Sequence, residues 1–113
     1  MVIIKFPDGI DWFKANWVFR RLVEDVGIAF PQKRDLVARM ERAQGIGAFI
    51  LNEMDADSSS EAMDAMRLVA QGTIGGEIPG WRRTHPDDEN GQRQYVESMK
   101  GLLTLIMKQT RRA

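Results

Sequence analysis

The chain has 113 residues, the usual size of one domain, and its lack of cysteine excludes disulfide frameworks and thiolate zinc sites. Its 16 basic and 16 acidic residues cancel, so no long-range field concentrates polyanions around it, and a general nucleic-acid binder is not expected. The N-terminal apolar run is too short for a signal peptide or a membrane span. We therefore expect one uncleaved, soluble, cytoplasmic domain.

The apolar spacing predicts a mainly α fold, a small four-helix bundle-like domain with a short N-terminal β-strand or extended arm. Residues 2–6 are β-branched and aromatic, and Pro7, Asp8 and Gly9 then provide a turn. No second strand is evident to pair with this one. Its backbone N–H and C=O groups have to be met by a second segment, by the same strand in another copy or by water, and we take this as a first indication of self-association.

The first helix is predicted from residue 12 to residue 26, with Asp11 as its N-cap and Gly27 at its end. Its apolar surface is unusually wide, because three aromatic side chains near its start do not fit on the arc occupied by the aliphatic ones. One contact face would not bury all of them. These aromatic residues are Trp12, Phe13 and Trp17.

A second helix is predicted over residues 35–54, with one continuous apolar face. Gly45 and Gly47 interrupt it, and each glycine costs about 1 kcal/mol in a helix interior. They indicate a kink, a close crossing with another helix, or a break followed by a strand over residues 46–51. Of these three we favour the close crossing.

Two further helices complete the prediction. Ser58 and Glu61 form a capping box for a helix over residues 59–71. An irregular segment over residues 72–88 follows, and loops of this length inside small domains are often functional. The last helix is the most clearly amphipathic one and is predicted to end near Gln109. Six of the seven methionines lie on the predicted inward stripes and fit ordinary core packing better than a binding groove, and Met1 is only the start residue.

The sequence gives little support for an enzyme. His85 is the only histidine, and with Asp87, Asp88 and Glu89 it forms the only cluster suited to a metal or to acid–base chemistry. Acidic residues in the first turn of a helix are already explained by the helix dipole. No nucleophile motif, phosphate loop or dinucleotide motif is present, and the acids near residue 55 match only half of a calcium loop. We predict no catalytic residues, no metal and no cofactor.

The aromatic excess near the first helix is the feature that best indicates a function. Tryptophan and arginine are enriched at binding hot spots, although an N-terminal helix with many aromatic residues can also be the central helix of the core. The loop at residue 81 adds a second aromatic and basic group. We predict a non-enzymatic interaction or regulatory domain that binds a protein partner or itself, with a homodimer as the expected oligomer. The predicted partner-binding residues are Trp12, Trp17, Arg20, Arg21, Trp81, Arg82 and Arg83.

Two other functions remain open from the sequence. Nucleic acid or a phosphorylated small molecule could bind through Trp81, Arg82 and Arg83, together with the C-terminal Arg111 and Arg112. The neutral charge of the chain argues against this alternative. An enzyme built on His85 and nearby carboxylates is the third hypothesis.

Overall fold

The structure is a computed structural model that describes residues 1–111, with side chains described as far as residue 109. Four helices and one small sheet make up the fold, which confirms the mainly α class. None of the helices in this described part is long and apolar enough to span a membrane. The elements in chain order are β1 (Val2–Lys5), β2 (Asp11–Lys14), α1 (Asn16–Ala29), α2 (Arg34–Ile46), β3 (Ala48–Ile50), the 3-10 turn η1 (Leu51–Glu53), α3 (Ala56–Ile74), the 3-10 turn η2 (Gly80–Arg83) and α4 (Glu89–Arg111).

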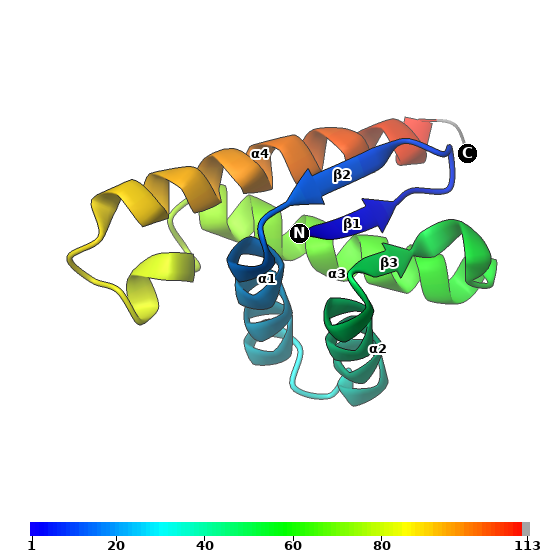
Figure 1. Ribbon diagram of the computed structural model, residues 1–113, viewed down its shortest axis with the longest axis horizontal. Helices are drawn as coiled ribbons and strands as arrows, with labels where there is room; N and C mark the ends of the chain where they lie inside the picture. The colour runs from blue at the N-terminus through cyan, green and yellow to red at the C-terminus, as the bar shows by residue number, and fades with distance from the viewer. Residues whose placement is uncertain (112–113) are drawn as a thin grey trace.

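The helices form two pairs that cross one another. α3 and α4 lie side by side along the longest dimension of the molecule, and α1 and α2 form a second pair that runs across them (Figure 1). The β1–β2 hairpin lies alongside α4. Large side chains fill the space between these layers, and the largest fully buried ones include Phe6, Phe19, Met66, Tyr95 and Met99.

The N-terminal strand has two partners in the same chain. β1 is the central strand and pairs antiparallel with β2, so that Ile3 lies opposite Phe13. On its other side β1 pairs parallel with β3, where Ile3 lies opposite Ala48. The predicted N-terminal strand is confirmed as β1, but its partners lie in the same chain, so the argument for self-association from an unpaired strand does not hold.

The first helix starts later than the sequence pattern predicts. Residues 11–14 form β2, and α1 begins at Asn16 and continues through Gly27 to Ala29. The mistake comes from the helical spacing of Phe13 and Trp17, which in fact belong to different elements. Because β2 alternates between its two faces, Trp12 points into the core and is only 4% exposed.

The glycine pair ends the second helix. Gly47 has a φ of 95°, and its backbone N–H donates to the Ala43 carbonyl at 2.7 Å, which closes α2 in a left-handed cap. β3 follows directly, so the close crossing that we favoured was wrong and the break followed by a strand is what forms. A long helix over residues 35–54 is thus replaced by α2, β3 and η1.

The last two helices form where the sequence predicts them, but their ends differ, and α3 extends beyond residues 59–71 at both ends. α3 begins at Ala56, where the carboxylate of Asp55, not Ser58, is the cap and accepts from the Ser58 N–H at 2.7 Å. α4 begins at Glu89, and Asp88 accepts from the Gly91 N–H at 2.8 Å. An acid at each helix start also agrees with the helix dipole.

Candidate functional site

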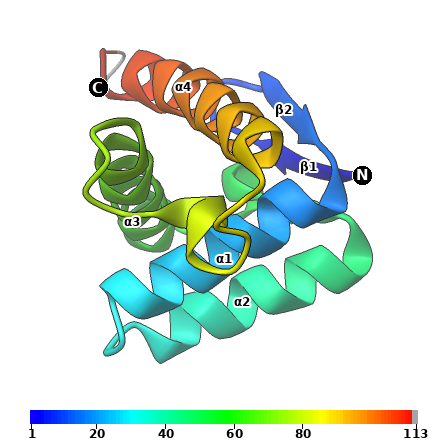
Figure 2. The same ribbon diagram turned by 90° about the vertical axis from the view of Figure 1, so that its left-hand side faces the viewer.

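The candidate site lies where α1, η2 and the start of α4 meet. η2 and the loop after it cover the side of α1 and lead directly into α4 (Figure 2). This arrangement brings Trp17, Arg20 and Arg21 on α1 close to Trp81 and the residues that follow it on η2. Two regions that are 64 residues apart in the sequence, at positions 17 and 81, therefore form one surface. We call this surface the aromatic cluster and define it by Trp17, Arg20, Arg21, Trp81 and His85.

Three rings form the centre of the aromatic cluster. The His85 imidazole stacks on the Trp81 indole with centroids 3.6 Å apart and planes 2° from parallel. Trp17 leans against the same indole at 4.7 Å and 57°. The Trp81 Nε1–H donates to the Asp88 carboxylate at 2.9 Å. Trp81 reaches α4 because Gly91 has no side chain, since a Cβ there would lie 2.2 Å from Nε1. These contacts hold Trp81 in one orientation.

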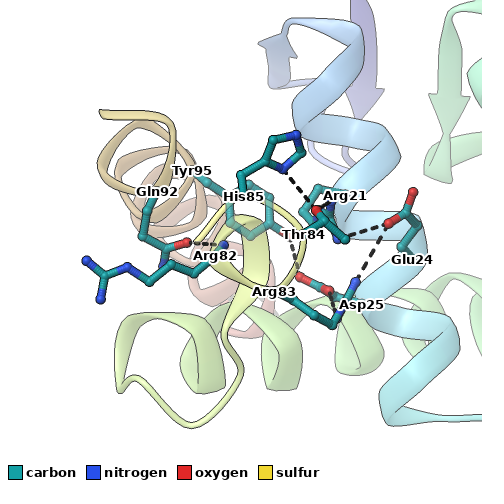
Figure 3. Close-up of polar contacts among 9 residues, drawn as sticks. All are labelled: Arg21, Glu24, Asp25, Arg82, Arg83, Thr84, His85, Gln92 and Tyr95. Carbon is teal, nitrogen blue, oxygen red and sulfur yellow. Dashed lines mark hydrogen bonds and ion pairs between the residues drawn. The ribbon is translucent and has the colours of Figure 1, made fainter. Parts of the chain in front are cut away.

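A buried carboxylate holds together the elements that carry the aromatic cluster. Asp25 on α1 has no exposed side-chain surface, and it accepts from the Tyr95 hydroxyl at 3.0 Å and from Arg83 Nη1 at 2.9 Å (Figure 3). Burial raises the pKa of Asp25, although Tyr95, Arg83 and Arg21 all act to lower it. Burial, together with the neighbouring Asp25, also raises the pKa of Tyr95 well above its ordinary value. The network joins α1, η2 and α4.

Arg21 connects this network to the rings. Its guanidinium is buried, donates from Nη2 to the Thr84 hydroxyl, and lies 5.6 Å from the centre of the Trp81 ring. Nη1 lies 3.0 Å from a Glu24 carboxylate oxygen, near enough for an ion pair although not aligned for a hydrogen bond. Thr84 is in turn 2.9 Å from Nδ1 of His85. Arg21 therefore orders the loop after η2 instead of extending into solvent.

The aromatic cluster borders a small cleft. The cleft has a volume of about 170 Å³, which is below the roughly 300 Å³ typical of the smallest pockets for drug-sized ligands. A space of this size suits one side chain or a small polar group better than a nucleotide. Its walls are Trp17, Arg20, Arg21, Glu24, Trp81 and His85.

Of the remaining predicted binding residues, Trp12 and Arg83 are engaged inside the fold, and Arg82 is exposed. Trp12 is in the core, and its indole is near Gly101 of α4. Arg82 lies 3.4 Å from a Glu89 carboxylate oxygen, and Arg83 is held by Asp25. The side chains of Arg111 and Arg112, which the phosphate alternative included, lie outside the described residues.

The cluster of His85 with neighbouring acids does not form a metal site. Among the described residues, no group of three or more histidines and carboxylates is close enough to hold an ion. Asp88 is engaged by Trp81 and by the start of α4, and these bonds lower its pKa. His85 contacts Trp81 and Thr84 instead.

Comparison with protein-family models, with curated proteins and with solved structures finds no significant match. The function of this chain therefore has to be argued from its own residues.

Sequence reasoning missed the two residues at the centre of the buried network. Asp25 lies between Val23 and Val26 on the apolar side of α1, and Tyr95 lies on the apolar stripe of α4. A charged residue at an inward helix position indicates a buried polar partner, because an unpaired buried charge is strongly unfavourable. That signal was available for Asp25, but the sequence does not say which residue is its partner.

Proposed function

We propose that this chain is a non-enzymatic protein-interaction or regulatory domain, a small four-helix domain of bundle-like packing that binds a protein partner through the aromatic cluster. The observation that carries the proposal is the half-buried pair of Trp17 and Trp81, held in place by the Asp25 network beside a cleft for one side chain. Rigid aromatic anchors bind with little loss of conformational entropy, so they are favoured as hot spots. Arg20 is exposed at the rim and can contact the partner's polar groups.

Binding of nucleic acid or a phosphorylated small molecule is a weaker alternative. A phosphate would have to displace the buried Asp25 carboxylate from Arg83, and Arg82 also contacts an acid, the exposed Glu89. One face of Trp81 is also covered by His85, which leaves less of the indole for stacking on a base. These contacts favour a protein partner.

The contacts of His85 also favour binding over catalysis. A catalytic imidazole is usually oriented by a carboxylate at one nitrogen, with the other directed at the substrate. Here Nδ1 faces the Thr84 hydroxyl and the ring lies flat on Trp81. We assign His85 a structural role in the aromatic cluster.

Charge reversal at the rim tests the proposal. We expect Arg20→Glu to reduce capture of a partner protein from native cell extract at least tenfold, as for loss of a hot-spot charge, without changing the fold. Arg42→Glu, on the exposed side of α2, is the matched control and should capture as well as wild type. Quantitative mass spectrometry measures how much of each protein the variants capture relative to wild type. Identical sets of captured proteins for all three chains would contradict the assignment.

A further inference from the structure

The sheet has an outer face that the helices do not cover. The side chains of Val2, Ile4, Trp12 and Phe49 point into the core, so the alternate residues of the three strands point outward. Across that outer face the register places Phe13, Ile3 and Ala48 in one row. A second row contains Asp11, Lys5 and Ile50. In Figure 2 the β1–β2 hairpin lies at one edge of the molecule.

This outer face is unusually apolar for a surface in contact with water. A sheet with one solvated face normally alternates apolar and polar residues, yet four of the six outward positions in the two rows are apolar. Phe13 is 49% exposed. Met1 and Ile46 are 74% and 79% exposed. They flank the end of the sheet where the Ile3 N–H donates to the Gly47 carbonyl at 3.0 Å. Both faces of the sheet therefore have the composition of a covered surface.

We propose that a second copy of this chain covers the outer sheet face, so that the domain forms a homodimer through β1, β2 and β3. The charges on the face support a second copy as the occupant. Lys5 and Asp11 oppose each other across β1 and β2, so the face has one base and one acid and no net charge. A two-fold axis that passes between these two positions would set Lys5 of each copy against Asp11 of the other, and this is the arrangement that we propose. The net charge of the whole chain is also zero, so two copies do not repel.

The exposed area indicates a weak dimer. Only three large apolar side chains, Phe13, Met1 and Ile46, are exposed at this face and its corner, too few for the ~800 Å² per partner of a standard specific interface. The polar rim has to supply the rest. We therefore expect a dissociation constant on the order of 10 to 100 µM.

Sedimentation equilibrium of the full chain, up to about 1 mM, tests this inference. We expect a mass above the 12.9 kDa of the monomer at high concentration, and at least a tenfold weaker association for Phe13→Lys. Ile46→Lys, at the most exposed of these positions, should weaken association similarly and does not disturb a strand. Leu68→Lys on α3 is the matched control and should leave the association unchanged.

Two further variants separate the possible results. Lys5→Asp should weaken the dimer, and the exchange of both charges in the Lys5→Asp, Asp11→Lys double variant should restore it. The inference goes beyond the proposed function and uses a different surface, so Arg20→Glu should leave the dimer intact. A wild-type chain that is monomeric at 1 mM overturns it. A dimer that is insensitive to Phe13→Lys and Ile46→Lys, or that is lost with Arg20→Glu, also contradicts a dimer through the sheet face.

Discussion

Replacing Asp25 with alanine should destabilise the domain by about 3 kcal/mol, a large fraction of the 5–15 kcal/mol typical of domains of this size. The Asp25 carboxylate is the acceptor for the Tyr95 hydroxyl at 3.0 Å and the counter-charge of Arg83 at 2.9 Å. Alanine would leave the buried hydroxyl without its acceptor and a cavity beneath η2. Urea unfolding monitored by tryptophan fluorescence measures the loss. Asp64→Ala, which breaks only an exposed contact to Arg67, should change stability by less than about 0.5 kcal/mol.

Replacing Asp25 with asparagine removes the titratable carboxylate but keeps the shape of the side chain. Burial raises the pKa of Asp25, so the folded state holds this proton to a higher pH than the unfolded state does. Protonation of Asp25 therefore contributes stability at low pH, and that contribution is lost as the pH rises through the raised pKa. Asp25→Asn lacks this titration. We expect the free energy of unfolding to favour wild type over Asp25→Asn more at pH 4 than at pH 7.

The other acids with altered pKa values do not obscure this comparison. Bonds to Ser58 lower the pKa of Asp55, and bonds to Gly91 and Trp81 lower that of Asp88. Each contributes stability that is lost as the pH falls, which is opposite in sign to Asp25. Because both proteins contain Asp55 and Asp88, these effects cancel in the difference. A difference that is constant from pH 4 to pH 8 would contradict the assignment of the raised pKa to Asp25.

The sequence predicts the helices well where local signals decide the structure, and poorly where pairing across the chain decides it. The apolar stripes of α3 and α4 are local and periodic, so both helices were found, and only their ends were displaced. β2 depends on its register with β1, and its four residues are too few to override the helical spacing of Phe13 and Trp17. Pro7, Asp8 and Gly9 between two short segments are in fact the signal of a hairpin.

The candidate site shows the same limit. The sequence identified Trp17, Arg21 and Trp81, which the fold brings together. It also placed Trp12 with them, and the two-residue period of β2 instead directs Trp12 into the core. The pairing of Asp25 with Arg83 joins positions 58 residues apart, and no local pattern specifies such a contact.

Replacing Gly80 with alanine should destabilise the domain by about 3 kcal/mol, because η2 is pressed against the ring of Tyr95. Gly80 has a φ of 55°, and a Cβ there would lie 2.8 Å from Cε2 of Tyr95. Left-handed backbone alone costs an alanine roughly 1 kcal/mol. Tyr95 is fully buried, so its ring has little room to move without lengthening its hydrogen bond to Asp25.

Gly76→Ala isolates the contribution of that contact. Gly76 has a similar φ of 78°, but no atom lies within 4 Å of its Cβ position, so only the roughly 1 kcal/mol of backbone strain is expected. Urea unfolding of both variants gives the difference, which reports the contact between η2 and Tyr95. Because Gly80→Ala acts partly through the bond from Tyr95 to Asp25, its effect should be smaller in the Asp25→Asn background. Equal losses for Gly80→Ala and Gly76→Ala would show that η2 is not packed on Tyr95, and the rigid support that we assign to Trp81 would then be absent.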